Sequence, residues 1–156
     1  MAAKAPEFVV DASASVNFAV STLPFHFQAR QLLEECARLG VQMVAPAWWQ
    51  AEADTALRKM VNAKILSPSA GQSAQQLLDA LPIAVIYDPA VRVLARDLAD
   101  LVKQVKVYDA VYLALAQVRG CVFWTADKRL FNAAQTAGLN YVRELGSFSS
   151  AINPTD

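Results

Sequence analysis

The chain has 156 residues, of which 55% are hydrophobic and 18% are charged, and its formal net charge is zero. This length corresponds to one domain with a sizeable core, and this composition excludes an intrinsically disordered chain. A neutral chain is not a general polyanion binder, so contact with nucleic acid would have to come from a local basic patch. No apolar run reaches the roughly 18 residues of a membrane-spanning helix, and no apolar signal segment precedes the first strand, which predicts a cytoplasmic protein with no membrane contact.

The sequence holds few residues of the kinds that bind zinc or act as bases. Cys36 and Cys121 lie far apart without C-x-x-C spacing, and His26 is the one histidine. This argues against a zinc site built from Cys and His and against a Ser-His-Asp triad, and leaves only His26 open as a general base. The absence of a G-x-G-x-x-G or Walker lysine loop argues against a nucleotide-binding module.

Short apolar strands alternate with helical segments in the first half of the chain. The amphipathic second helix ends at Gly40, a residue typical of helix C-termini, and Pro46 stands at the start of a helix, where proline is tolerated. The predicted elements are, in order, a strand at 7–11, helices at 13–20 and 25–39, a strand at 41–45, and a helix from Pro46 to about Met60.

The same alternation continues through the second half. The predicted elements are a helix at 67–81, a strand at 83–87, helices at 88–104 and 108–119, a strand at 121–125, a helix at 128–137 and a strand at 140–143. No repeat or linker divides the chain, so we expect a single domain over residues 1–156, with a core at about 7–146 and a flexible tail at 147–156. Strands separated by helices predict an α/β fold with a parallel sheet covered on both faces.

Four lone acids interrupt otherwise apolar stretches. Asp11 and Asp127 follow predicted strands, Glu52 lies within the stretch 47–53, and Asp109 stands near the start of 107–118. Buried carboxylates are costly, and several in one pocket repel one another. In parallel α/β folds, ligands bind outside the carboxyl ends of the strands. A divalent cation bound there would compensate the charge, which makes metal-dependent chemistry the first hypothesis.

Each acid also has a simpler structural interpretation. Asp11 and Asp127 are typical helix N-caps, each worth about 1 kcal/mol. Asp109 lies in a first helical turn, where the helix dipole favours an anion. Glu52 is harder to explain in this way, because its neighbours at helical spacing are apolar and include Trp48.

Considered together, the four acids predict one convergent pocket. Hard carboxylate ligands suit Mg²⁺ or Mn²⁺, and the hydroxyls of Ser13 and Thr125 could hold waters or carboxylates in place. The lack of a credible side-chain base is consistent with a metal-activated water as nucleophile. Asp54 is an alternative to Glu52, but two residues correspond to a rotation of about 200° around the helix, so both cannot face one ion.

Four segments in this order resemble those of a known family. They are Phe-Val-Val-Asp-Ala-Ser at 8–13, Ala-Pro-Ala-Trp-Trp-Gln-Ala-Glu at 45–52, Tyr-Asp-Ala-Val-Tyr-Leu-Ala-Leu-Ala at 108–116, and Thr-Ala-Asp-Lys-Arg-Leu at 125–130. In order and spacing, over about residues 8–143, the chain resembles the PIN-domain ribonucleases, especially the VapC-type toxins of toxin–antitoxin pairs.

The resemblance implies a three-layer α/β/α fold around a central parallel sheet of about five strands. It also implies cleavage of single-stranded RNA that depends on one or two Mg²⁺ or Mn²⁺ ions. VapC-type proteins typically form homodimers that a small antitoxin holds inactive. The family's acidic quartet and its accessory hydroxyls fall on Asp11, Glu52, Asp109 and Asp127, and on Ser13 and Thr125.

Basic side chains near these segments predict contacts with RNA phosphates. Such contacts give affinity without sequence specificity, and each of these residues could equally lie on an ordinary solvated face. Tyr108 or the tryptophans could stack a base, although a core role is the first expectation for Trp48 and Trp49. The apolar segment 18–27 could contact a second copy or an antitoxin. The basic residues are Arg92, Arg96, Lys103 and Lys106, predicted to share one helical face, with Lys128 and Arg129, and with Arg58, Lys59 and Lys64.

The leading hypothesis is a metal-dependent endoribonuclease that is the toxin of a toxin–antitoxin pair. A PIN nuclease of RNA processing without an antitoxin is a second hypothesis. A third is a catalytically silent PIN-like scaffold for RNA or protein binding, against which the retention of all four acids argues. Carboxylates of this kind would also suit a DNA nuclease or a phosphatase, and only the resemblance favours RNA.

Overall fold

A five-stranded parallel sheet forms the centre of the protein. The structure, a computed structural model, describes residues 4–103 and 105–149. The strand order is β3-β2-β1-β4-β5, with β1 in the middle. The strands are β1 (Glu7–Val10), β2 (Gln42–Pro46), β3 (Ile83–Ile86), β4 (Val122–Thr125) and β5 (Val142–Glu144), each parallel to its neighbours. The predicted α/β fold with a central parallel sheet of about five strands is confirmed.

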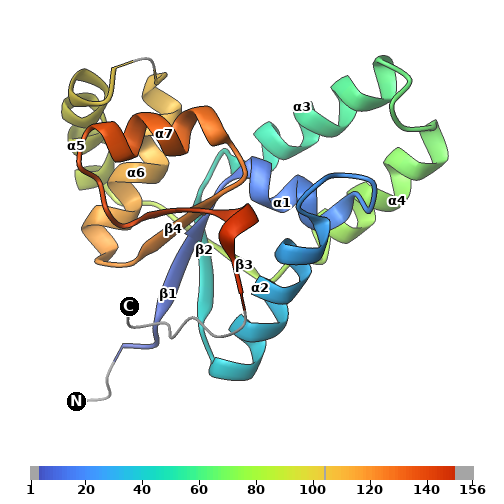
Figure 1. The fold of residues 1–156 in the computed structure, drawn as a ribbon, viewed down its shortest axis with the longest axis horizontal. Coiled ribbons are helices and arrows are strands. Elements are labelled where there is room, and N and C mark those ends of the chain that lie inside the picture. Colours follow the sequence, from blue (N-terminus) through green and yellow to red (C-terminus); the bar gives the residue numbers. More distant parts are fainter. Residues whose placement is uncertain (1–3, 104, 150–156) are drawn as a thin grey trace.

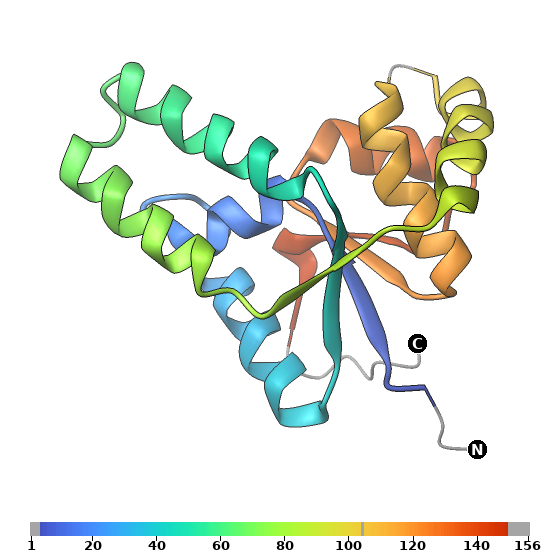
Figure 2. The ribbon, with the colours of Figure 1, turned by 180° about the vertical axis from the view of Figure 1, so that it is seen from behind.

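Helices cover both faces of this sheet, which gives three layers (Figures 1 and 2). On one face α6 and α7 contact the strands and α5 packs on α6, while α1 and α2 lie on the other face and α3 and α4 project beside α1. The helices are α1 (Ala12–Ala19), α2 (His26–Leu39), α3 (Trp49–Asn62), α4 (Pro68–Asp79), α5 (Pro89–Leu101), α6 (Val107–Arg119) and α7 (Lys128–Thr136), followed by a short 3-10 turn η1 (Leu145–Ser147).

Both faces of the central strands are buried, which explains why these strands are apolar at successive positions. The face toward α6 carries Val9, Val44 and Phe123. The face toward α2 carries Phe8, Met43 and Trp124. Across the described ranges 4–103 and 105–149, none of the helices combines the length and the apolar character that a bilayer crossing requires.

The sequence located each of the strands and α-helices but missed the turn η1 and some boundaries. The helix predicted at 88–104 ends at Leu101 as α5, and position 104 lies outside the described residues. The predicted flexible tail is wrong at its start: Ser147 belongs to η1, and the buried ring of Phe148 packs edge-on against Trp124 with ring centres 5.2 Å apart. Residues 150–156 of that tail lie outside the described part.

The topology brings the N-termini of four helices toward one edge of the sheet. Helices α1, α3 and α7 directly follow β1, β2 and β4, so they begin at the carboxyl edge. Helix α6 is joined to the start of β4 through Gly120 and Cys121, so it runs against the strand direction and begins on the same side. Residues placed early in these helices therefore come together although the sequence separates them widely.

The packing of Phe148 gives a test of where the folded core ends. We expect Phe148→Ala to lower the free energy of unfolding by about 3 kcal/mol, because it removes a buried ring from the contact with Trp124. Phe27→Ala is the matched control, since the Phe27 side chain is 68% exposed and its removal should cost less than about 1 kcal/mol. Chemical denaturation measures both values, and equal costs would place Phe148 outside the core.

Candidate functional site

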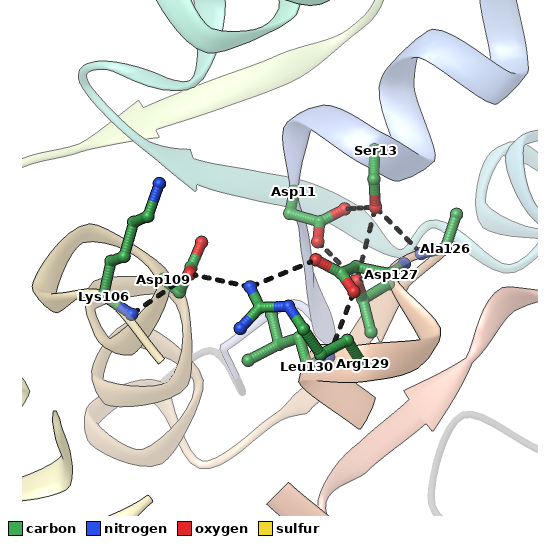
Figure 3. Close-up of polar contacts among 9 residues, drawn as sticks. Asp11, Ser13, Lys106, Asp109, Ala126, Asp127, Arg129 and Leu130 are labelled. Atoms are coloured by element: carbon green, nitrogen blue, oxygen red, sulfur yellow. Dashed lines mark hydrogen bonds and ion pairs between the residues drawn. The ribbon is translucent and has the colours of Figure 1, made fainter. Parts of the chain in front are cut away.

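The carboxylate of Asp11 lies buried at the junction of β1 and α1. It caps α1 by accepting a 2.9 Å hydrogen bond from the Ala14 N–H. The Ser13 hydroxyl donates to its Oδ1 at 2.7 Å (Figure 3). The Thr125 hydroxyl donates to its Oδ2. Burial raises the pKa of Asp11 to about 6, the three hydrogen bonds oppose that rise, and the charge of Asp127 adds to it.

The hydroxyls of Ser13 and Thr125 tie the end of β1 to the loop after β4. Ser13 Oγ accepts from the Ala126 N–H at 3.0 Å, as Figure 3 shows. Thr125 Oγ1 accepts from the Asp127 N–H at 3.0 Å. The two hydroxyl oxygens lie 3.3 Å apart. Each hydroxyl thus donates to Asp11 while accepting from the loop that presents Asp127, so the two acids are held in a common frame.

Asp127 and Asp109 stand at the starts of α7 and α6, with an arginine between them. Asp127 Oδ1 accepts from the Leu130 N–H at 3.0 Å, and Asp109 Oδ2 accepts from the Lys106 N–H at 3.2 Å. Nη2 of Arg129 lies 3.6 Å from Asp109 Oδ2 and 3.9 Å from Asp127 Oδ2. Figure 3 shows the guanidinium between the two carboxylates, where it offsets their mutual repulsion.

Glu52 reaches the site from the first turn of α3. Its Oε1 accepts a 3.2 Å hydrogen bond from the hydroxyl of Tyr112, a buried residue of α6. Burial raises the pKa of Glu52 to about 7, the Tyr112 hydrogen bond lowers it, and the charges of Asp109 and Asp11 raise it further. Glu52 therefore belongs electrostatically with the other acids.

The four carboxylates are suitable ligands for a hard divalent cation, but they lie too far apart to bind one together in this structure. They come from the N-termini of four helices at one edge of the sheet, and their charges act on one another. Within residues 4–103 and 105–149, however, no three acid, His or Cys side chains lie close enough to hold an ion. Helix capping and the Arg129 bridge hold Asp109 and Asp127 in other contacts. Binding of a cation would therefore require Arg129 to move aside.

Residues 8–136 match the PIN domain family. The chain belongs to this family. PIN domains are typically nucleases and generally use divalent metal ions, and the resemblance inferred from the four sequence segments is thereby confirmed. No match to the chain is found among curated proteins.

Two solved structures share the fold of this PIN domain. PAE2754 from Pyrobaculum aerophilum is 21% identical, with a TM-score of 0.64, and the match covers 92% of this chain and 94% of that one. VapC20 of Mycobacterium tuberculosis, described as a toxin that cleaves the sarcin-ricin loop, is 15% identical, with a TM-score of 0.58, and the match covers 81% of this chain and 94% of that one. At these identities the likeness concerns the fold.

Other polar residues considered from sequence lie away from the acids of this PIN domain. Asp54 accepts a 2.7 Å hydrogen bond from Gln75 of α4. His26 has its Nδ1 at 2.9 Å from the backbone oxygen of Asn17, which gives the ring a structural role between α1 and α2. Sequence analysis missed Tyr112, whose position three residues after Asp109 places both on one helix face.

The basic residues predicted to share one helical face do not form a single row. Helix α5 ends at Leu101, and Lys106 is the residue that precedes α6, so the continuous helical face expected through Lys106 is wrong. Lys103 lines a groove of about 740 Å³ together with Lys128 and Arg129. Arg92 and Lys106 line a different groove, beside Glu52.

The raised pKa of Glu52 gives a pH-dependent prediction. Because its pKa is near 7 in the folded protein and near 4.5 when unfolded, charging Glu52 destabilises the fold progressively as pH rises from about 4.5 to about 7. In EDTA, Glu52→Gln should therefore raise the free energy of unfolding at pH 8, by about 1 kcal/mol because Glu52 is partly exposed. At pH 4 the same substitution should leave the free energy of unfolding unchanged or lower it.

Thermal unfolding at the two pH values measures this difference. Asp54→Asn is the matched control, because it removes a carboxylate from the same helix outside the site. If Glu52→Gln raises the stability equally at both pH values, or if Asp54→Asn raises it in the same way, the electrostatic link between Glu52 and the other acids is contradicted.

Proposed function

We propose that this PIN domain is a divalent-metal-dependent endoribonuclease that hydrolyses phosphodiester bonds of single-stranded RNA, and that it is the toxin of a toxin–antitoxin pair. The observation that carries the proposal is that Asp11, Glu52, Asp109 and Asp127 stand at the starts of four helices on one edge of the sheet, in a member of a nuclease family. VapC20, which shares the fold and is described as a toxin that cleaves the sarcin-ricin loop, supports the choice of RNA and of a toxin.

The four acids would hold one or two Mg²⁺ or Mn²⁺ ions. Carboxylates are the preferred ligands of these hard cations. Burial and, to a lesser extent, the charges of Asp109 and Asp11 raise the pKa of Glu52, and a nearby cation would offset both effects. When bound, the ion supplies Lewis acidity that polarises the phosphate and activates water.

The protein's own residues keep the acids ready for this role. Ser13 and Thr125 engage the two oxygens of Asp11, and Tyr112 fixes one oxygen of Glu52. These contacts hold the carboxylates in place before substrate arrives, which reduces the reorganisation needed during reaction. Arg129 lies between Asp109 and Asp127 and offsets their repulsion, a role that a bound cation would take over.

RNA would approach across basic side chains on either side of the acids. The groove along α7 presents Lys103, Lys128 and Arg129, and Arg92 lies on the opposite side beside Glu52. Arg96 is exposed on α5 and could add a further phosphate contact. Such contacts give sequence-independent affinity that falls with salt concentration.

The proposal includes two protein partners, a small antitoxin and a second copy of the chain. A VapC-type toxin would pair with a small antitoxin and form a homodimer in the cytoplasm. The apolar segment 18–27 that was considered for such contacts is only partly available, since Val20 is buried whereas Phe27 is exposed. A nuclease of RNA processing would share the active site but have no antitoxin.

A catalytically silent scaffold is the second candidate function. Arg129 between Asp109 and Asp127 favours it, because a guanidinium held there satisfies the two carboxylates without any ion. The two hypotheses differ in what a divalent cation does to the protein and to RNA.

Cleavage of a mixed single-stranded RNA by the purified protein tests the nuclease directly. We expect cutting with Mg²⁺ or Mn²⁺ and none in EDTA, and we expect Asp11→Asn to reduce the rate by about 100-fold or more, because a ligand and the bonds that hold it are lost. Asp54→Asn is the control that keeps full activity. Cutting that survives Asp11→Asn would come from a contaminant, and no cutting under any condition would favour the scaffold.

Replacing Arg129 tests whether its guanidinium competes with the metal. Arg129→Gln should tighten Mn²⁺ binding about thirtyfold, since the repulsion between a guanidinium and a divalent cation about 4 Å apart is worth about 2 kcal/mol in water. Nη2 of Arg129 lies 3.6 and 3.9 Å from the carboxylate oxygens that would bind the ion. Isothermal calorimetry measures the affinity without reference to activity. Arg38→Gln, which removes the same charge from α2 where Arg38 pairs with Glu35, should change nothing. Unchanged or weaker Mn²⁺ binding by Arg129→Gln would show that the guanidinium does not occupy the cation's place.

A further inference from the structure

A groove of about 790 Å³ opens directly beside the acid cluster. It lies between α3, α5 and the start of α6, and Glu52 forms part of its wall. Asp109, another acid of the cluster, accepts a hydrogen bond from the backbone N–H of Lys106, and the side chain of Lys106 lines the same groove. The groove is therefore continuous with the candidate active site, and a chain that crossed the acids would pass into it.

Two aromatic side chains stand exposed in this groove. Trp48, which precedes α3, is 38% exposed, and Tyr108, in the first turn of α6, is 48% exposed. The adjacent Trp49 is only 2% exposed, so the structure divides the tryptophan pair into one core residue and one groove residue. Exposed flat rings in a groove are the feature on which proteins stack unpaired bases.

Three cations share the groove with these rings. They are Lys59 of α3, Arg92 of α5 and Lys106, whose Nζ lies 5.5 Å from the centre of the Tyr108 ring. In the part of the chain that the structure describes, none of the three forms an ion pair with an acidic side chain. Positive charge without a protein counter-ion, next to exposed rings, matches the phosphate and the base of a nucleotide.

We propose that this groove is a nucleotide subsite that binds an unpaired RNA base next to the scissile phosphate. The base stacks against Trp48 and Tyr108, and the flanking phosphate contacts Lys59, Arg92 or Lys106. Stacking requires a base whose face is free, so the subsite selects single-stranded over duplex RNA and tolerates different bases. The proposal rests on the proposed ribonuclease function and specifies its substrate near the cut.

The charge of the groove argues against a second copy of the chain as its occupant. In a twofold dimer the same surface of each copy meets, so Lys59, Arg92 and Lys106 of one copy would face those of the other. Juxtaposed like charges weaken such a contact, whereas an RNA backbone neutralises them.

The test measures binding rather than cleavage, with the full chain in EDTA. Fluorescence anisotropy of a labelled single-stranded RNA 8-mer should show about tenfold weaker binding for Trp48→Ala and for Tyr108→Ala, and near-normal binding for Trp48→Phe, which keeps an aromatic ring. Tyr87→Ala is the control, because the Tyr87 ring is 84% exposed and is not among the groove residues. Circular dichroism confirms that each variant is folded.

An RNA probe without bases makes the test specific to stacking. An abasic 8-mer should bind the wild-type protein about as weakly as Trp48→Ala binds the normal RNA, and Trp48→Ala should weaken abasic binding no further.

Binding of normal RNA that both alanine variants retain would overturn the subsite. So would loss of self-association by these variants in sedimentation, which would make the groove a contact between copies. If wild-type protein cleaves RNA while the alanine variants bind normally, only the subsite fails; if wild-type protein neither binds nor cleaves RNA, the proposed function fails with it.

Discussion

The carboxylate of Asp11, buried where β1 meets β4, is the interaction on which the rest of the site depends. A buried carboxylate is expensive, and here the Ala14 N–H and the hydroxyls of Ser13 and Thr125 compensate it. The same two hydroxyls accept hydrogen bonds from the loop that carries Asp127. A single network thus connects the central pair of strands, the start of α1 and the start of α7.

The fold brings four helix N-termini to this edge, and an acid stands at each of them. Capping bonds stabilise Asp11, Asp109 and Asp127 separately, by about 1 kcal/mol each, whereas Glu52 accepts a hydrogen bond from Tyr112 instead. Burial is the main cause of the raised pKa values of Asp11 and Glu52, and the charges of the neighbouring acids raise them further. The Tyr112 hydroxyl stabilises the Glu52 carboxylate, and Arg129 offsets part of the repulsion between Asp109 and Asp127. A divalent cation would relieve more of it, and this links the architecture to the proposed chemistry.

Sequence reasoning located what local patterns determine and missed what tertiary contacts decide. The apolar runs at β1, β2 and β4 and the helix-ending Gly40 identified the parallel sheet and its covering helices. Nothing local separates Trp48 from Trp49, because only the packing of α3 buries one and exposes the other. The bridge formed by Arg129 likewise depends on how α6 and α7 approach, and the buried place of Phe148 depends on Trp124, which lies far away in the sequence.

The most direct test of the central claim is anomalous diffraction from crystals of the protein soaked in Mn²⁺. If the four acids form one cation site, an anomalous peak will appear among Asp11, Glu52, Asp109 and Asp127, with the Arg129 guanidinium displaced from between the two carboxylates that it bridges. Crystals that take up Mn²⁺ elsewhere, or none at all while Arg129 keeps its place, would contradict the account.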